Sequence, residues 1–242
     1  PTYNEKENIA DMLAAIFSLR QGFHVLVIDD GSPDGTAAIV RKLQAQYPQE
    51  LFLIEREGKL GLGTAYITGF RWSLAKGYHF IFEIDADFSH NPADLNRLYE
   101  ACASGKADVA VGSRNVKGGG TLNWPWSRIL LSRGGSLYTR LITWMPVKDA
   151  TAGFVCYRRE VLDKLNLEAI TSTGYAFQIE MKFASWKLGF TIQEVPIIFQ
   201  DRKYGQSKMH KGIIQEGILG VLRLRWQSMF RDYHKRVRNS AA

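Results

Sequence analysis

The chain has 242 residues, 45% of them hydrophobic and 12% aromatic, which is enough for one large domain or two small ones with a full core. Charged residues make up 23%, and this composition excludes a disordered or fibrous chain. The formal net charge of +7 suits phosphate-bearing partners, which include nucleotides, nucleic acid and an anionic membrane surface.

The first half of the chain alternates short apolar runs with amphipathic segments. The apolar runs predict buried strands at residues 24–29, 51–55, 78–84 and 108–111. Apolar residues at helical spacing predict helices at residues 9–16, 37–47, 64–76 and 92–104. This alternation predicts a mostly parallel sheet with helices on both faces, which binds ligands at the carboxyl ends of its strands. Because the chain starts at Pro1 without a Met, we also expect a first strand upstream of it.

The second half has a different pattern. It predicts a helical hairpin at residues 124–144, a strand at 151–157, a helix at 175–188, a strand at 190–199, a polar basic loop at 201–210 and an amphipathic helix at 212–238. No uncharged apolar run approaches the roughly 20 residues of a membrane-spanning helix. Cys102 and Cys156 lie in apolar surroundings that predict buried free thiols. We therefore expect one α/β domain at residues 1–210 and an appended basic helix at residues 211–242.

Carboxylates gather where two of the predicted strands end. Asp29 and Asp30 close the first strand, and Asp85 and Asp87 follow the third strand two residues apart. Side chains at i and i+2 on extended backbone point to the same side. Two carboxylates aimed at one point repel each other unless a cation lies between them, and hard oxygen ligands favour Mg²⁺ or Mn²⁺. Asp85 and Asp87 are therefore predicted to hold a divalent ion that binds a diphosphate.

A glycine-rich segment precedes the third predicted helix. Gly58, Gly61 and Gly63 would let the backbone approach a phosphate closely, and Lys59 supplies a positive charge. The segment lacks the Gly-Lys-Ser/Thr ending of a Walker motif. Taken alone, it is better explained as an ordinary turn at the start of a helix.

An ordered set of sequence blocks carries more information than any single motif. The blocks are PTYNE at 1–5, DDGS at 29–32, GKLGLG at 58–63, DAD at 85–87, VGSR at 111–114, GGG at 118–120, NWP at 123–125, SRG at 132–134, GYAFQIE at 174–180, and DR at 201–202 through SK at 207–208. From Pro1 to about Met209 this set resembles glycosyltransferase family 2, and more narrowly its dolichyl-phosphate (polyprenyl-phosphate) mannose synthases. The resemblance implies a GT-A type nucleotide-diphospho-sugar transferase fold. It also implies transfer of mannose from GDP-mannose to a polyprenyl (dolichyl-type) monophosphate.

The resemblance also assigns residues to the donor. It places Pro1, Tyr3 and Glu5 at the guanosine, Asp30 at the nucleotide, and Asp85 and Asp87 at the metal, beside the phosphate contacts expected of Lys59 and Gly61. Many relatives carry Gln two residues after the second Asp, as a third metal ligand. This sequence has Ser89 there, a weaker ligand whose place a water molecule would fill.

A lipid monophosphate acceptor would account for the arginines in the second half of the chain. A lipid monophosphate must approach a donor diphosphate, and two such anions repel each other unless positive charge lies between them. By resemblance, Arg114, Arg128 and Ser132 bind the lipid phosphate, whereas Arg202 and Lys208 lie on a loop that closes over donor and acceptor. Arginine suits this role because its guanidinium binds phosphate oxygens in a bidentate manner.

The expected chemistry needs no strong general base, because an acceptor phosphate oxygen is already anionic at pH 7. This agrees with five scattered histidines, each better explained as structural or exposed. The reaction would be an in-line displacement at the anomeric carbon, giving inversion to polyprenyl-phosphate β-mannose. Asp87, Arg114 and Arg202 are the residues expected to act in catalysis, through the metal and the positive charge that stabilise the departing GDP.

A polyprenyl acceptor requires access to a bilayer. Residues 212–238 carry apolar side chains at helical spacing and an arginine-rich remainder, the pattern of a helix lying in a membrane interface. Residues 124–144 would form a second contact. We expect a peripheral protein on the cytoplasmic face of a membrane, with room for a membrane protein partner. The alternative for residues 212–238 is a core-packed helix with a soluble basic tail.

Two other functions compete with mannosyl transfer. One is a glucosyl-phosphate or other glycosyl-phosphate lipid synthase that uses a UDP-sugar. The other is a nucleic-acid-binding protein, which only the basic charge supports. The acidic strand ends would repel a nucleic acid backbone unless a metal were bound, so no nucleic acid partner is expected.

Overall fold

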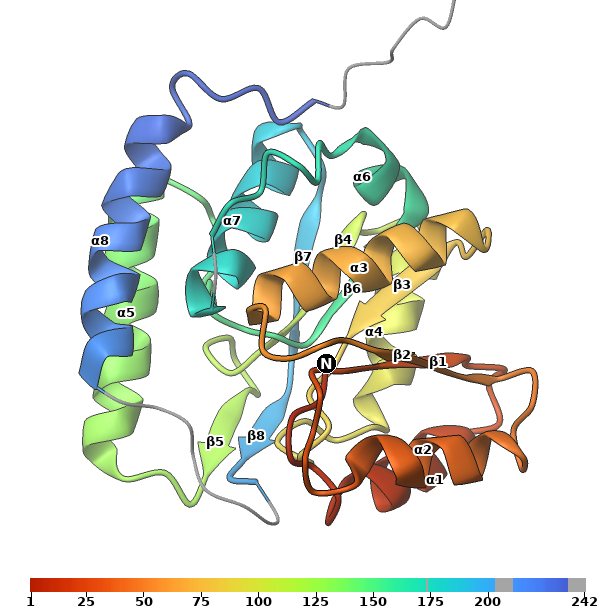
Figure 1. Cartoon of the computed structure of the whole chain (residues 1–242). Coiled ribbons are helices and arrows are strands. Elements are labelled where there is room, and N and C mark those ends of the chain that lie inside the picture. Colours follow the sequence, from red (N-terminus) through yellow and green to blue (C-terminus); the bar gives the residue numbers. More distant parts are fainter. Residues whose placement is uncertain (173, 203–210, 235–242) are drawn as a thin grey trace, which may run out of the picture.

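The structure is a computed structural model of the chain, and it describes residues 1–172, 174–202 and 211–234. The described part holds three sheets with helices packed around them, and two long helices lie along one side of the molecule (Figure 1).

The N-terminal part is a parallel strand pair covered on both faces. Its elements are β1 (Val25–Asp29), β2 (Leu51–Glu55), α1 (Ile9–Ser18), α2 (Thr36–Gln44) and α3 (Leu62–Ala75). α1 and α2 lie on one face of the pair and α3 lies on the other (Figure 1). Ile9, Leu13 and Val40 from the two helices bury themselves against Val27 and Leu51 of the strands. Because the strands run in parallel, Asp29 and Glu55 end them side by side.

A four-stranded sheet forms the centre of the molecule. Its elements are β3 (Phe80–Glu83), β4 (Val109–Ser113), β6 (Val155–Arg158) and β7 (Ile192–Pro196), flanked by α4 (Asp94–Ala103), α6 (Arg159–Lys164) and α7 (Gly174–Lys187). The strand order is β3-β6-β4-β7; β6 runs antiparallel to both its neighbours, and β4 pairs with β7 in parallel. β3, β4 and β7 therefore point the same way and end at one edge of the sheet.

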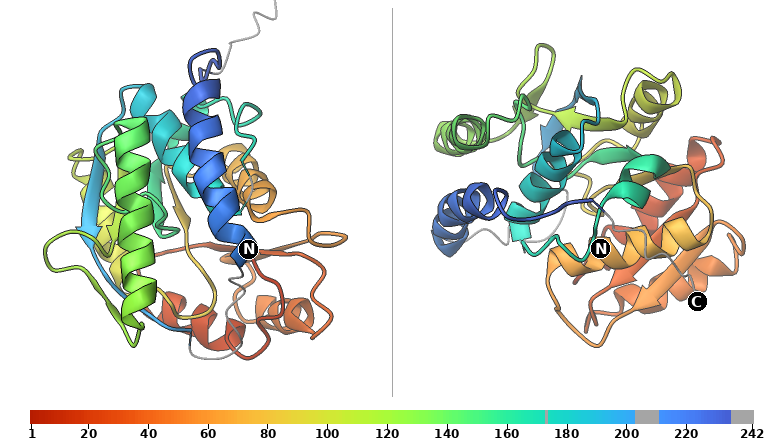
Figure 2. Two further views of the ribbon diagram at one scale, coloured as in Figure 1. Left: turned by 90° about the vertical axis from the view of Figure 1, so that its left-hand side faces the viewer. Right: turned by 90° about the horizontal axis from the view of Figure 1, so that it is seen from above.

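A small sheet and two long helices complete the fold. They are β5 (Gly120–Leu122), β8 (Ile198–Gln200), α5 (Trp126–Thr143) and α8 (Lys211–Gln227). β5 and β8 pair in parallel. α5 and α8 lie side by side at the edge of the molecule (Figures 1 and 2), and the Tyr138 hydroxyl donates to the Ile218 carbonyl at 3.0 Å.

The predicted α/β class is confirmed, and every strand predicted in the first half appears within a few residues of its place. β6 is the exception to the parallel arrangement. Cys102 and Cys156 are buried free thiols, as predicted. The short elements β5 and α6 escaped prediction because three and six residues are too few to show a periodic pattern.

The predicted hairpin at residues 124–144 is wrong, because α5 is one continuous helix. Gly134 and Gly135 suggest a turn, yet the chain stays helical through them. The face of α5 that is buried carries the small residues Ser136, Thr139 and Thr143. In the described part of the chain, only Tyr138 and Ile142 of α5 pack against the core beside these residues, so the apolar pattern is too sparse to reveal a continuous helix.

Two further segments differ from prediction. Residues 190–199 do not form one strand: β7 ends at Pro196, and the chain enters the small sheet at Ile198. Between them the Ile197 amide donates to the Ser113 carbonyl at 3.0 Å, which turns the chain from one sheet to the other. The predicted helix at 212–238 ends at Gln227, and its last residues, 235–238, lie outside the described part.

A cavity of about 520 Å³ lies between the first strand pair and the central sheet. Leu26 and Ile28 of β1 line one side, and Phe80 and Phe82 of β3 line the other. Pro1 also lines it. The strand expected before Pro1 and the division into residues 1–210 and 211–242 stay predictions. None of the helices in the described part is long and apolar enough to span a bilayer.

Candidate active site

The candidate site lies at the sheet edge where β1, β3 and β4 end. Asp30 follows β1, Asp85 and Asp87 follow β3, and Arg114 follows β4 directly. The topology therefore brings acidic and basic residues from distant parts of the sequence to one crevice, as expected for strands with a common direction.

Asp87 lies in a turn after β3 and not on the strand, so the alternation of extended backbone expected for Asp85 and Asp87 does not hold. β3 ends at Glu83, and Phe88 has the left-handed φ of 61°. Asp87 is 6% exposed; its Oδ1 accepts a hydrogen bond from the Ser89 amide at 3.0 Å, and its Oδ2 lies 3.2 Å from the Arg202 guanidinium. The Asp85 side chain is 45% exposed and thus accessible from the crevice.

Electrostatics favour a cation at this turn. Desolvation, followed by the negative charge of Asp87, raises the pKa of Asp85 to about 6. Burial likewise raises the pKa of Glu83 to about 7, although Gln178 donates to this carboxylate at 2.6 Å. The charge of Asp87 therefore makes ionisation of Asp85 more costly, and the charge of Asp85 does the same to Glu83; a divalent ion would relieve both effects.

The protein ligands available here suit a metal ion that also binds phosphate or water. Among the described residues no group of three or more His, Cys, Asp or Glu is arranged to hold a metal. Asp85 and Asp87 would supply two carboxylate oxygens, leaving positions for phosphate or water, as Mg²⁺ and Mn²⁺ sites at nucleotides do. The Ser89 backbone is occupied, since its amide donates to Asp87 and its carbonyl accepts from Gln200. Ligation by its hydroxyl stays a prediction.

Asp30 forms a buried ion pair that the sequence analysis missed. The Arg56 Nε lies 2.8 Å from Asp30 Oδ1, and the two side chains are only 8% and 11% exposed. Arg56 also donates to Thr64 and to the Gly61 carbonyl at the start of α3. Burial raises the pKa of Asp30 in spite of Arg56. Arg56 comes directly after β2, as Asp30 comes directly after β1. The parallel pairing of these two strands is therefore the feature that could have predicted the ion pair.

Among the other residues predicted to bind the donor, Tyr3, Glu5 and Lys59 have defined contacts. Lys59 Nζ lies 3.7 Å from the centre of the Tyr3 ring, so the structure brings these two predicted residues together. Glu5 is buried and accepts a hydrogen bond from Asn8 at 3.0 Å. Asp29 accepts from Thr2 and Ser32, so it secures the chain near Pro1.

Two glycines in the predicted phosphate loop have distinct roles. Gly61 has a φ of 96° and a ψ of 144°, a conformation closed to other residues, and α3 begins directly after it. A Cβ on Gly63 would lie 2.8 Å from the Phe177 ring and 2.9 Å from the Ser172 carbonyl. Gly63 therefore lets α3 pack closely against α7, and Gly61 is the better candidate for a phosphate contact.

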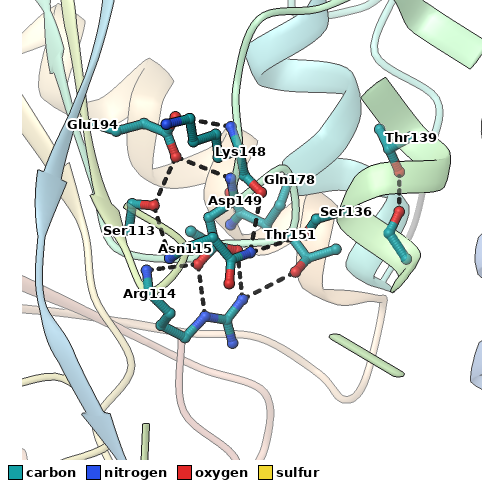
Figure 3. Close-up of polar contacts among 12 residues, drawn as sticks. Ser113, Arg114, Asn115, Ser136, Thr139, Lys148, Asp149, Thr151, Gln178 and Glu194 are labelled. Atoms are coloured by element: carbon teal, nitrogen blue, oxygen red, sulfur yellow. Dashed lines mark hydrogen bonds and ion pairs between the residues drawn. The ribbon is translucent and has the colours of Figure 1, made fainter. Parts of the chain in front are cut away.

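Arg114 is held by several hydrogen bonds (Figure 3). Asp149 accepts hydrogen bonds from its backbone amide at 2.9 Å, from Nε at 2.7 Å and from a terminal nitrogen at 2.6 Å. The same terminal nitrogen donates to Thr151 at 3.0 Å. Arg114 lines a small cavity together with Ser132, so these two predicted acceptor residues lie near each other.

Arg128 lies close by on α5. Its guanidinium packs 3.9 Å from the centre of the Trp124 ring and forms an ion pair with Asp201. Trp124 contacts Phe199 edge to face, and the Arg114 guanidinium lies 5.3 Å from the centre of the Phe199 ring. These aromatic rings separate and orient the two arginines. Lys208 lies outside the described residues.

His90 is the histidine nearest to these groups. It is 2% exposed and packs against Phe154 and Phe199. Burial lowers its pKa to about 4, so the ring is uncharged at neutral pH. His90 is thus part of the packed floor of the site, in keeping with the structural role predicted for the histidines.

An α/β fold whose strand ends carry acidic residues (Asp85 and Asp87, here called the acidic turn) beside clustered arginines is the arrangement expected of a glycosyltransferase. Residues 1–165 match the family described as Glycosyl transferase family 2, and the chain belongs to this family. It is 44% identical over 221 residues to a polyprenol monophosphomannose synthase of Mycolicibacterium smegmatis, covering 91% of this chain and 83% of that protein. It is also 44% identical over 233 residues to an undecaprenyl-phosphate mannosyltransferase of Micrococcus luteus, covering 95% of each chain.

Solved structures confirm the GT-A fold. The crystal structure of glucosyl-3-phosphoglycerate synthase from Mycobacterium tuberculosis with phosphoglyceric acid superposes with a TM-score of 0.67 at 18% identity, over 93% of this chain and 78% of that one. A second structure of that enzyme, with Mn²⁺, UDP-glucose and phosphoglyceric acid, gives a TM-score of 0.66 at 19% identity with the same coverage.

Proposed function

We propose that the protein transfers mannose from GDP-mannose to a polyprenyl monophosphate and yields polyprenyl-phosphate β-mannose. The arrangement of charges carries the proposal: an acidic turn suited to a divalent ion lies in one crevice with a rigid arginine cluster suited to a second phosphate. The names of the two relatives, a polyprenol monophosphomannose synthase and an undecaprenyl-phosphate mannosyltransferase, support this sugar and this acceptor.

The donor would bind along the ends of β1, β2 and β3. Tyr3 and Glu5 would contact the guanosine beside Pro1, and Asp30, fixed by Arg56, would contact the nucleotide. Lys59 and the backbone at Gly61 would contact the diphosphate. Asp85 and Asp87 would hold Mg²⁺ or Mn²⁺, with or without Ser89, and the ion supplies positive charge to the donor diphosphate.

The acceptor phosphate would bind between Arg114, Arg128 and Ser132. One of its oxygens attacks the anomeric carbon; the new carbon–oxygen bond forms as the bond to GDP breaks, and the configuration inverts. The phosphate needs no base, and the only histidine at the crevice among the described residues, His90, is uncharged and buried. Arg202 lies at the acidic turn, where it and Lys208 would stabilise the charge of the leaving GDP.

A bilayer contact would bring the lipid to the site. α5 carries Arg128 and Ser132 toward the crevice and exposes Trp126 (82%), Leu130 (74%) and Leu141 (65%) elsewhere on its surface. α8 lies beside it and exposes Leu219 and Trp226, and the Arg225 guanidinium packs 5.1 Å from the centre of the Trp144 ring. An apolar face with arginines and tryptophans favours attachment to an anionic membrane surface. The protein would then act at the cytoplasmic face, with or without a membrane partner.

The test is a transfer assay with purified protein, Mg²⁺ or Mn²⁺ and radiolabelled donor. GDP-mannose with polyprenyl phosphate should give a labelled lipid. UDP-glucose with the same acceptor tests the alternative glycosyl-phosphate lipid synthase. A labelled lipid from UDP-glucose alone, or no labelled lipid from either donor, would overturn the proposal.

A further inference from the structure

Asp149 is a buried acid for which the predicted reaction has no use. Its side chain is 0% exposed, so neither substrate can reach it. It lies in the loop between α5 and β6, far in sequence from Arg114. Burial alone would raise its pKa, but the hydrogen bonds and the charge of Arg114 outweigh that effect and hold the pKa below the usual value. The carboxylate is therefore charged, and its negative charge is directed at Arg114.

The contacts between the two residues restrict the conformation of the arginine side chain. Asp149 binds the backbone amide, Nε and a terminal nitrogen of Arg114 within 2.9 Å, which fixes both ends of the side chain. Thr151 accepts from the same terminal nitrogen at 3.0 Å. A long arginine side chain otherwise loses considerable rotamer entropy when it binds a ligand. Here that entropy is lost on folding, before any phosphate arrives.

Asp149 is itself fixed by a second acid, the half-buried Glu194. On β7, Glu194 Oε1 accepts from the Asp149 amide at 2.9 Å and from the Ser113 hydroxyl at 2.6 Å, while Oε2 accepts from the Lys148 amide at 2.8 Å (Figure 3). Ser113 is the last residue of β4 and precedes Arg114. Glu194 therefore ties the loop of Asp149 to the strand that presents Arg114.

We propose that Asp149, fixed by Glu194, is a positioning residue that orients the Arg114 guanidinium for the acceptor phosphate. The proposal rests on the proposed function, because it gives Arg114 the acceptor phosphate as its ligand. It goes further in assigning acceptor affinity to two acids that touch neither substrate. Rigid preorganisation of this kind raises affinity by lowering the ordering cost of binding.

Asp149→Asn tests the proposal. Asn keeps the volume of the side chain but has no negative charge. Its NH2 group replaces one of the two carboxylate oxygens, so one hydrogen-bond acceptor for Arg114 is lost. We expect KM for polyprenyl phosphate to rise about tenfold to a hundredfold, the range for loss of a charged hydrogen bond, and KM for the sugar nucleotide to stay within about twofold. Equal changes in both KM values, or a fall in kcat alone, would show that Asp149 does not act through the acceptor.

A direct binding measurement separates this inference from the proposed function. Citronellyl phosphate, a short isoprenyl monophosphate, can be titrated into wild-type protein and Asp149→Asn by calorimetry. If wild-type protein binds it and the variant binds equally tightly, the positioning role is excluded although the proposed function stands. If wild-type protein neither binds it nor forms mannosyl lipid, the proposed function fails first.

Two further variants keep the test decisive. Glu180→Gln is the matched control, because Glu180 is also 0% exposed and binds an arginine at 2.6 Å, but that arginine, Arg231, lies in the segment after α8. Glu180→Gln should lower the stability of the protein, but it should not raise the KM for polyprenyl phosphate relative to the KM for the sugar nucleotide. If Asp149→Asn does not fold, Thr151→Val removes a single hydrogen bond to Arg114 and should raise acceptor KM about threefold to tenfold. An unchanged acceptor KM in that variant would overturn the proposal.

Discussion

The Arg202 guanidinium lies 3.2 Å from Oδ2 of Asp87, so an ion pair links the chain after β8 to the acidic turn after β3. A divalent ion and Arg202 would share this carboxylate. The ion pair thus couples the position of residues 201–202 to the charge at the turn, and residues 203–210 follow directly in the chain.

Asp87→Asn should lower kcat/KM by about a hundredfold or more, since the variant loses one of two carboxylates for the ion and the partner of Arg202. The fold should persist, because the backbone contact with Ser89 needs only an oxygen acceptor. Transfer of labelled mannose and thermal unfolding measure the two effects. Wild-type rates with this variant would remove Asp87 from the catalytic machinery.

Arg56→Gln should weaken donor binding and lower stability together. The change leaves the nearly buried Asp30 without its cationic partner, and breaking such a pair costs about 3–5 kcal/mol at fully buried sites. Arg41→Gln is the control, because its ion pair with Glu55 is exposed and worth about 0–1 kcal/mol. In Arg56→Gln, the free energy of unfolding in urea should fall and the KM for the sugar nucleotide should rise. In Arg41→Gln, both values should stay close to those of the wild type.

The sequence marks the candidate site residues by their positions, but it does not reveal the contacts among them. Asp85, Asp87 and Arg114 stand at strand ends, where a pattern of apolar runs followed by polar residues marks them. Arg56 and Asp149 complete pairs across 26 and 35 positions of the chain, and no local pattern marks such partners. Glu194 lies in the middle of a strand, where its charge looks like a solvent-facing residue.

The errors in the fold have a related cause. The glycines of α5 have weak helix propensity, which tertiary packing overrides. Pro196 has no N–H for a sheet, so a run that looks like one strand changes sheets at that point. In both cases a partner distant in sequence decides the local structure.

Lys182 should give the protein a pH-dependent stability at alkaline pH. Burial lowers its pKa to about 8 despite the nearby charges of Glu83 and Asp149, and its ammonium donates to the Ala152 carbonyl at 2.6 Å. Between pH 8 and the ordinary lysine value of 10.5, the unfolded state binds more protons than the folded state at this residue. Stability contributed by this group therefore rises with pH across that window.

Urea unfolding of wild-type protein and Lys182→Met from pH 7 to pH 10.5 measures this effect. The difference in free energy of unfolding, wild type minus variant, should increase above pH 8. The contributions of the other titrating groups are the same in both proteins and cancel in this difference. A difference that stays constant or decreases over that window would show that Lys182 keeps an ordinary pKa in the fold.

The exposed apolar face of α5 should control membrane attachment. Trp126→Ser with Leu130→Ser removes two side chains that are 82% and 74% exposed, so stability should change by less than about 1 kcal/mol. Binding to vesicles that contain anionic lipid should weaken at least tenfold, because each buried apolar side chain adds to interfacial affinity. Tyr99→Ser on α4, remote from α5 and α8, is the control (Figure 1). Co-sedimentation with vesicles that is equal in the wild type and the double variant would show that another surface meets the bilayer.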